Sequence, residues 1–390
     1  MSQNQTAIAS RQHRIELQLQ QLISRVQQHL ALPLNLLNGR AGQLLFLYQA
    51  AKWQPRWVSE SYLSTEIDRL HEASANLVTD PTLSTGLPGV AWFYQYILQD
   101  QQVLEDCNQN TDSCLIQMLQ QGMTETEYVL GLAGMAPYIG RRLAYNSQLA
   151  QVFLQQMALR SVCIQPGLRC WPVPSQSVFR LNKNQPDLPE YNLGFAHGQA
   201  GMIAALLPLL DLPATASQAA TLIGEGCNWL LAQQQDANIH GSYFAHLAGV
   251  AGVSRLAWCY GDLAIALLLA RVANKLAKPE YAQAARQFGC HAAKRTVAQA
   301  MITDPWICHG AGGLALMFRL LYRQLPQPEF LAAADSWLDQ LLGQLAGQAY
   351  PEQPTDPTAT GLISGAAGAG LCLLDALDQA PDWVDALLLG

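Results

Sequence analysis

Glycine pairs with the spacing Gly-x-x-Gly recur along this chain of 390 residues, each ahead of an apolar run of helical length. One copy is degenerate and reads Gly261-Asp262-Leu263-Ala264. The first glycines of the seven copies are Gly39, Gly86, Gly131, Gly198, Gly261, Gly310 and Gly365. Each interval between them has room for two helices and their connections. A repeat of this length predicts an array of helix hairpins.

The two helices of each predicted hairpin differ in polarity. The runs that start at Gly261 and Gly310 are apolar on nearly every side, which is typical of a helix buried all round. The segments 217–235 and 279–297 alternate polar and apolar faces, as surface helices do. This pattern predicts an all-α fold, an α/α toroid of seven helix-hairpin repeats. An open α-solenoid has the same local pattern, but the apolar inner series favours a closed ring.

We expect one toroidal domain over residues 1–390. Within it, residues 1–30 form an N-terminal helical extension that either binds a leader peptide or caps the ring. Residues 161–195 are rich in Pro, Asn and Gln and interrupt the rhythm of the repeat, which indicates a long loop insertion or a small strand pair. This insertion leads directly into His197, so we expect it beside any site at that position.

The composition argues against one class of binding partner and indicates a cellular compartment. Only 13% of the residues are charged and the formal net charge is −7, without a cluster of Lys and Arg, which argues against a nucleic-acid partner. The first residues carry no apolar core of signal-peptide type, and no apolar stretch is long enough to cross a membrane. We therefore expect a cytoplasmic protein with reduced cysteines. Association with a membrane-bound partner complex stays open.

Aligning the copies on their first glycines reveals a cluster of reactive residue types. Cys259 and Cys308 both stand two residues before a glycine, in neighbouring repeats. His197, Tyr260 and His309 stand one residue before a glycine, in three successive repeats. In a toroid the turns before the inner helices would meet at one mouth of the ring. The shared register therefore predicts that these side chains converge.

The residue types in this register suit a metal ion. Cys259, Cys308 and His309 would give Zn²⁺ two thiolates and one imidazole and leave a fourth position open, which is the pattern of catalytic rather than structural zinc. A single buried cysteine is more often a small hydrophobic residue, and only the common register favours ligation here. The other seven cysteines lie outside it and are expected to be ordinary thiols: Cys107, Cys114, Cys163, Cys170, Cys227, Cys290 and Cys372.

Three more residues are candidates for the same site. His197 is either a fourth ligand, which would close the metal site, or a free acid or base near it. Arg255 lies four residues before Cys259 in a segment with little other polarity and could anchor a developing anion. Tyr260 is either a packed aromatic residue or a supporting hydroxyl group.

Three short strings together resemble the lanthionine synthetase C-like (LanC-like) family, and the likeness extends through the seven glycine repeats. The strings are Gly194-Phe195-Ala196-His197-Gly198, Trp258-Cys259-Tyr260-Gly261 and Cys308-His309-Gly310. The resemblance implies an α/α toroid with one zinc ion per chain, held by Cys259, Cys308 and His309. It implies an acid/base role for His197, supported by Arg255 and Tyr260.

Glu127 is the one departure from the family's pattern. It lies four residues before Gly131, where the family often has Asp. The added methylene keeps the carboxylate but moves it, so Glu127 is a candidate for the family's acidic residue rather than an identical match.

The activity that the resemblance implies is the closure of thioether rings in lantibiotic biosynthesis. A cysteine thiol of a dehydrated precursor peptide would add, as a zinc-activated thiolate, to dehydroalanine or dehydrobutyrine. His197 would protonate the resulting enolate. A chain of this length has no room for a dehydratase beside a complete toroid, so the implied partners are a separate dehydratase and a transporter of the same maturation complex.

Other functions fit the same residues. A relative that joins glutathione or another small thiol to dehydroamino acids would need the same activated thiolate. A non-catalytic zinc-containing scaffold or binding protein of a peptide-maturation complex is a second alternative, and the departure at Glu127 keeps it open. A prenyltransferase β-subunit is also a helical toroid with zinc, but that family combines Asp with Cys and His as ligands, so it ranks lowest.

Overall fold

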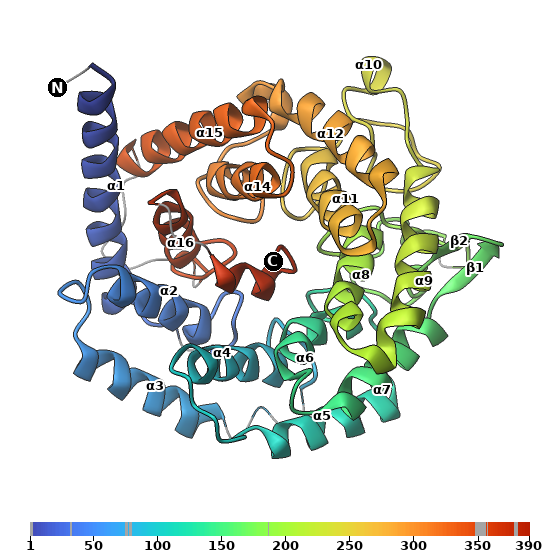
Figure 1. Ribbon diagram of the computed structural model, residues 1–390, viewed down its shortest axis with the longest axis horizontal. Helices are drawn as coiled ribbons and strands as arrows, with labels where there is room; N and C mark the ends of the chain where they lie inside the picture. Colours follow the sequence, from blue (N-terminus) through green and yellow to red (C-terminus); the bar gives the residue numbers. More distant parts are fainter. Residues whose placement is uncertain are drawn as a thin grey trace.

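The computed structural model describes residues 3–31, 33–74, 77, 80–185, 187–347, 356, 358–377 and 381–390. In this part of the chain the regular structure is helical apart from one antiparallel pair of strands, β1 (Val162–Gln165) and β2 (Leu168–Cys170). The helices form two concentric rings (Figure 1). The predicted all-α class and the α/α toroid are confirmed.

The inner ring begins each of its helices at a predicted glycine. Every first glycine of the seven repeats is an N-cap, and Gly131 caps the short 3₁₀ turn η2 (Leu132–Met135) that runs into its inner helix. All eight residues of α8 are buried, as expected for a helix enclosed on every side. The inner helices are α2 (Arg40–Trp53), α4 (Leu87–Asp100), α6 (Ala136–Arg142), α8 (Gln199–Leu206), α11 (Asp262–Leu276), α14 (Ala311–Gln324) and α16 (Ala366–Ala376).

The outer ring buries one stripe of each helix. In α3, for example, Leu63 and Leu70 are buried while most other residues are at least partly exposed. The N-terminal helix α1 packs on the last inner helix α16, so the two ends of the chain complete the seventh hairpin. The outer helices are α1 (Gln3–Gln28), α3 (Glu60–Ser74), α5 (Gln109–Gln121), α7 (Ser147–Leu159), α9 (Pro213–Leu231), α12 (Pro279–Ala293) and α15 (Pro328–Gly347).

The C-terminal residues occupy the centre of the ring (Figure 1). The 3₁₀ helix η4 (Asp382–Leu387) buries Trp383 and Leu387 there. Two residues of the turns that precede inner helices hold its main chain, because the Tyr128 hydroxyl donates to the carbonyl of Ala386 and Trp258 Nε1 donates to that of Leu387. The end of the chain is thus part of the core.

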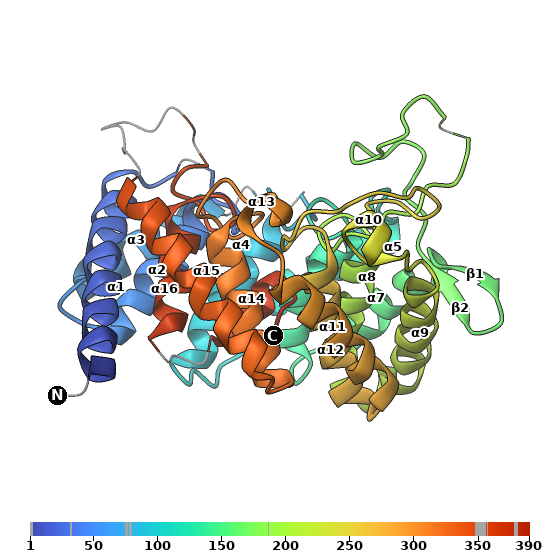
Figure 2. The ribbon, with the colours of Figure 1, turned by 90° about the horizontal axis from the view of Figure 1, so that it is seen from above.

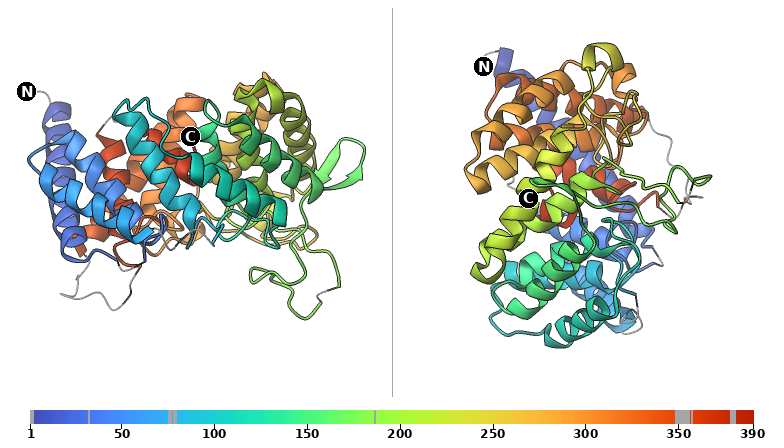
Figure 3. Two further views of the ribbon diagram at one scale, coloured as in Figure 1. Left: turned by 90° about the horizontal axis from the view of Figure 1, so that it is seen from below. Right: turned by 90° about the vertical axis from the view of Figure 1, so that its right-hand side faces the viewer.

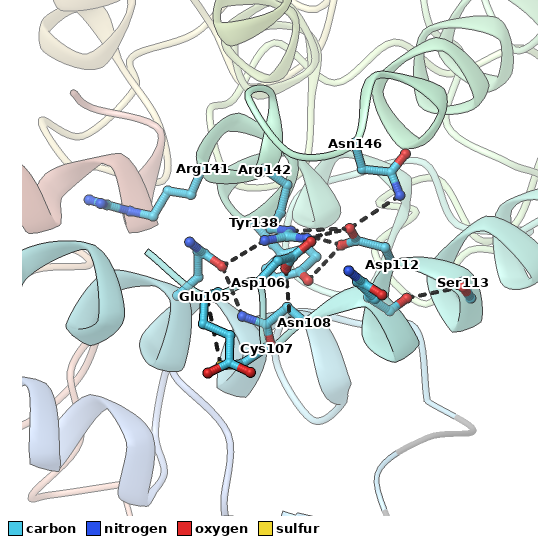
Figure 4. Close-up of polar contacts among 12 residues, drawn as sticks. Glu105, Asp106, Cys107, Asn108, Asp112, Ser113, Tyr138, Arg141, Arg142 and Asn146 are labelled. Atoms are coloured by element: carbon cyan, nitrogen blue, oxygen red, sulfur yellow. Dashed lines mark hydrogen bonds and ion pairs between the residues drawn. The ribbon is translucent and has the colours of Figure 1, made fainter. Parts of the chain in front are cut away.

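A buried polar network fastens the third hairpin (Figure 4). Arg142 of α6 and Asp112 of α5 are each 1% exposed, and Arg142 Nη2 lies 2.7 Å from Asp112 Oδ2 and 2.7 Å from Asp106 Oδ1. The Tyr138 hydroxyl donates to Asp112 Oδ1 at 2.7 Å, and Asn146 Nδ2 donates to Oδ2 at 3.1 Å. Since removing one partner would leave a buried charge uncompensated, this network sets the position of α5 against α6.

The long connections gather at one end of the toroid (Figure 2). They include the segments that carry the short helices α10 (Ala237–His240) and α13 (Val297–Ala300), and the loop that follows β2. The hairpin of β1 and β2 projects sideways from the rings (Figure 3). The proposed domain limits, 1–390 with an extension at 1–30 and an insertion at 161–195, stay predictions. Among the described residues, no helix has both the length and the apolarity to cross a lipid bilayer.

Closure of the inner ring depends on a glycine, which gives a test with a matched control. A Cβ atom at Gly370 of α16 would collide with the buried ring of Phe46 in α2. We predict that Gly370→Ala lowers the free energy of unfolding by about 1–3 kcal/mol through overpacking. Gly343→Ala in α15, where a Cβ meets no atom within 4 Å, should instead stabilise by about 0.5–1 kcal/mol. Chemical denaturation measures both, and equal effects would contradict the close approach.

Candidate metal centre and active site

Main-chain hydrogen bonds join the loops that precede neighbouring inner helices. Most of the groups involved stand two residues before a repeat glycine, which is the position of Cys259 and Cys308. The bonds run from Ser84 N to Val129 O, Tyr128 N to Ala196 O, Ala196 N to Cys259 O, Cys259 N to Cys308 O, Cys308 N to Ile363 O and Ile363 N to Leu37 O. The sequence register therefore corresponds to adjacency in space, and distant segments meet at one end of the ring.

Each of these loops is a tight turn that requires its glycine. The amide of Ala311 donates to the carbonyl of Asp304, seven residues earlier, at 2.9 Å, and Gln199 and Leu87 make the equivalent bonds in their repeats. At Gly261 the backbone has φ +100°, and a Cβ atom there would collide with the carbonyl of Arg255. Only glycine suits that turn, so it fixes the direction of the preceding Cys259 and Tyr260.

The two cysteines of the register are in contact. The amide of Cys259 donates to the carbonyl of Cys308, and the two thiols are hydrogen-bonded to each other. The hydrogen bond from Cys308 lowers the pKa of Cys259 to about 7, and the nearby charges of His309 and Arg255 act in the same direction. Cys259 is only 8% exposed. The pair thus lies beside cationic groups, with Cys259 buried and Cys308 partly exposed.

His309 is oriented by a carboxylate. Its Nδ1 donates to Asp304 Oδ2 at 2.7 Å, and Asp304 Oδ1 accepts the amide of Trp306 at 2.9 Å. The bond to Asp304 raises the pKa of His309, and burial of the imidazole only partly opposes this. Because Nδ1 is engaged, Nε2 is the ring nitrogen left for a ligand. Metal-binding histidines are commonly held in this way.

The predicted zinc ligands lie near one another, but not in the arrangement of a formed metal site. Among the described residues, no three side chains of His, Cys, Asp or Glu stand close enough together to hold a metal ion. The assignment of Cys259, Cys308 and His309 as ligands, and of one zinc ion per chain, stays a prediction.

His197 makes a second pair of imidazole and carboxylate. Its Nδ1 donates to Glu127 Oε2 at 2.6 Å, and both side chains are largely buried. The Glu127 carboxylate also accepts the amides of Val129 at 2.9 Å and Leu130 at 2.5 Å, so it is held firmly. Phe179 from the loop after β2 stacks on the imidazole, with ring centroids 3.8 Å apart and planes 21° apart. His197 therefore presents Nε2 from a fixed position.

Tyr260 and Arg255 belong to the same loop as Cys259. The Tyr260 hydroxyl accepts a hydrogen bond from Asn192 Nδ2 at 2.7 Å, and its ring packs on His246 with centroids 4.7 Å apart. Burial raises the pKa of Tyr260, so it stays a hydroxyl group at neutral pH. The charge of Arg255 acts on both thiols and on Asp304. All seven predicted site residues thus come together at one end of the ring.

Sequence reasoning missed Asp304, Asn192 and Phe179. The first two carried a signal, since both stand six residues before a repeat glycine. Asp80 has the same register in the second repeat, where its carboxylate accepts the Thr85 hydroxyl at 2.6 Å. Phe179 lies in an irregular loop, and nothing in the sequence indicated that its ring would reach His197.

Comparisons with known proteins agree with the predicted family and fold. The family model described as "Lanthionine synthetase C-like protein" matches residues 31–389. Among solved structures, the chain is similar to nisin cyclase with a TM-score of 0.70 and 19% sequence identity, over 97% of this chain and 97% of that one. At this identity the likeness demonstrates the fold. No curated protein matches the chain.

The hydrogen bonds that the Glu127 carboxylate accepts should stabilise the fold, and this contribution can be measured without an activity assay. In Glu127→Ala, the amides of Val129 and Leu130 and the imidazole of His197 lose their acceptor. We predict a loss of about 1–3 kcal/mol in the free energy of unfolding. Glu127→Gln keeps one acceptor oxygen at the same reach and should lose less. A change within about 0.5 kcal/mol for Glu127→Ala, as at an ordinary surface position, would contradict the assignment.

Proposed function

The chain belongs to the lanthionine synthetase C-like family, and we propose that it is a zinc-dependent lanthipeptide cyclase. It would add cysteine thiols of a dehydrated precursor peptide to dehydroalanine or dehydrobutyrine and so form lanthionine or methyllanthionine rings. One observation carries the proposal: the pair of Cys259 and Cys308 lies beside an imidazole whose free nitrogen is Nε2, and near a second imidazole held by Glu127.

The side chains at this site are of the types that bind zinc, namely cysteine and histidine. Two cysteine sulfurs are already in contact, and His309 has the tautomer that a ligand through Nε2 requires. Asp304 is the group that would hold that imidazole in place. A bound zinc ion would supply the positive charge that makes a substrate thiol acidic enough to react near neutral pH.

The residues around this centre have complementary tasks. Glu127 accepts a hydrogen bond from Nδ1 of His197, so that Nε2 is the nitrogen that can take up the proton of the substrate thiol and pass it to the substrate carbon, and Phe179 stacks on the ring. The Tyr260 hydroxyl, which accepts from Asn192, retains its own proton as a hydrogen-bond donor for an enolate oxygen. The guanidinium of Arg255 would stabilise the same negative charge.

The reaction balances without an oxidant or reductant. The substrate thiol gives its proton to Nε2 of His197, and the carbon–sulfur bond forms at the β-carbon of the dehydro residue. The electron pair of the carbon–carbon double bond moves to the enolate. Protonation at the α-carbon by His197 completes the ring. A separate dehydration reaction on Ser and Thr must supply the substrate, so we propose a separate dehydratase and a transporter as partners, with the enzyme in the cytoplasm beside a membrane-bound complex.

Ring formation on a defined peptide tests the proposal. A synthetic peptide with one dehydroalanine and one cysteine is incubated with the purified protein, and free thiols are counted by alkylation and mass spectrometry. We predict that the peptide loses its free thiol while its own mass stays the same, because ring closure only rearranges its atoms. The rate of this loss should fall about 100- to 10,000-fold in His197→Asn. A matching peptide without cysteine, given with glutathione, tests the alternative of small-thiol addition. If neither peptide reacts faster than without protein, the non-catalytic scaffold is the better account.

Metal content tests the ligand set separately. We predict about one zinc ion per chain, lost in Cys308→Ala and retained in His197→Asn. Asp304→Asn should weaken zinc binding about 10- to 100-fold because the imidazole of His309 loses its orienting carboxylate. Asp80→Asn is the matched control, since Asp80 has the same register and the same turn contacts but no ligand beside it. Equal zinc affinity in the two Asn variants would contradict the role of Asp304.

A further inference from the structure

One position of the repeat, three residues before each first glycine, is buried in every copy. The side chains there are at most 1% exposed. Four repeats have leucine or isoleucine at this position, whereas three successive repeats have an aromatic residue. In chain order the seven residues are Leu36, Leu83, Tyr128, Phe195, Trp258, Ile307 and Leu362. The aromatic ones belong to the three loops that carry Glu127, His197 and Cys259.

The three aromatic rings form a cluster. Tyr128 and Trp258 pack edge to face, with ring centroids 5.5 Å apart and planes at 74°. Phe195 packs on Trp258 with centroids 6.0 Å apart and planes at 57°. Such contacts stabilise a fixed arrangement of the rings. Because Tyr128 follows Glu127 and Trp258 precedes Cys259 in the chain, the cluster joins the loops of the candidate site from inside the ring.

The polar groups of this cluster bind one segment at the centre of the toroid (Figure 1). We call residues 382–389 the central segment. The Tyr128 hydroxyl donates to the carbonyl of Ala386, and Trp258 Nε1 donates to the carbonyl of the next residue, Leu387, at 3.2 Å. Burial raises the pKa of Tyr128, so its hydroxyl keeps the proton that it donates. Two consecutive carbonyls of the central segment thus hold two loops of the site.

The central segment is fastened to other inner helices as well. The Tyr96 hydroxyl of α4 donates to Asp382 Oδ1 at 2.7 Å. Arg141 of α6 donates to the carbonyl of Asp382 at 3.1 Å, and its Nε lies 2.8 Å from Asp385 Oδ2. Because α4 and α6 hold the segment through these contacts, it offers its carbonyls to Tyr128 and Trp258 from a fixed position.

Tyr128 lies beside both members of the pair of Glu127 and His197. It follows Glu127 in the chain, and its amide donates to the carbonyl of Ala196, the residue before His197, at 3.1 Å. The residue is therefore held at its main chain by the loop of His197 and at its hydroxyl by the central segment. A shift of Tyr128 would move the carboxylate that orients the imidazole.

We propose that the central segment positions the pair of Glu127 and His197, and that Tyr128 is the positioning residue through which it does so. This inference rests on the proposed function and adds to it a residue that does not touch the substrate. A displacement of about 1 Å at a reacting group can cost about 100-fold in rate. A hydroxyl group inside the ring can therefore affect chemistry at its mouth.

NMR of the histidine ring nitrogens tests the positioning without activity. Long-range proton–nitrogen spectra of the ¹⁵N-histidine-labelled, full-length protein report both ring nitrogens of His197, which His197→Asn identifies by removing their signals. We expect Tyr128→Phe, which removes only the hydroxyl, to shift the Nδ1 resonance because the bond to Glu127 changes. Tyr138→Phe is the matched control, since Tyr138 is equally buried and its hydroxyl donates instead to Asp112 (Figure 4). It should leave the resonances of His197 unchanged.

Kinetics with the peptide that carries one cysteine and one dehydroalanine give a second readout. We expect Tyr128→Phe to lower kcat about tenfold while KM and zinc content stay unchanged, because the imidazole is displaced and the substrate contacts remain. Tyr96→Phe, which releases the central segment at Asp382, should shift the Nδ1 resonance and lower kcat in the same direction. Tyr138→Phe should keep the parental kcat. Thermal unfolding should show lower melting temperatures for both Tyr128→Phe and Tyr138→Phe, since each loses a buried hydrogen bond.

Three results would overturn the proposal. In the first, Tyr128→Phe has the His197 resonances and the kcat of the parent. In the second, Tyr138→Phe changes both readouts as much as Tyr128→Phe does, so that a general loss of stability explains the effect. In the third, Tyr96→Phe leaves both readouts unchanged, which removes the role of the central segment. If the parent protein closes no ring, the proposed function fails, and the resonances of His197 alone decide whether Tyr128 positions the pair.

Discussion

The hydrogen bonds between neighbouring loops at the mouth of the toroid are what the candidate site depends on. The bond from the Cys259 amide to the Cys308 carbonyl places residues 49 positions apart in the sequence side by side. The bond from the Ala196 amide to the Cys259 carbonyl adds the segment of His197 in the same way. Since main-chain groups make these links, the fold determines the positions while the side chains remain free for chemistry.

The site contains the same arrangement twice, an imidazole oriented by a carboxylate. At Asp304 and His309 the pair stands beside two thiols, whereas at Glu127 and His197 it stands under an aromatic ring. Surroundings rather than residue type thus separate a proposed metal ligand from a proposed proton donor. Glu127 makes this contact despite its extra methylene, because two main-chain amides hold its carboxylate in place.

Periodicity predicted the toroid, because each glycine of the repeat begins an inner helix and each inner helix is buried on nearly all sides. It also predicted the meeting of Cys259, Cys308 and His309, since equivalent positions in a ring share one end. The partners of these residues were harder to predict. Asp304 orients His309 within its own loop, and Asn192 reaches Tyr260 in the next loop, from a repeat position that the alignment did not consider. Phe179 depends on the path of an irregular loop braced by Arg180.

The central claim is that Cys259, Cys308 and His309 together bind a zinc ion with one position left for a substrate thiol. X-ray absorption at the zinc edge of the loaded protein tests it most directly. The account predicts two sulfur neighbours at about 2.3 Å, one imidazole nitrogen at about 2.0–2.1 Å and one light atom. On addition of a cysteine-containing peptide, the number of sulfur neighbours should rise to three. Zinc bound without sulfur, or a closed set that the peptide leaves unchanged, would contradict it.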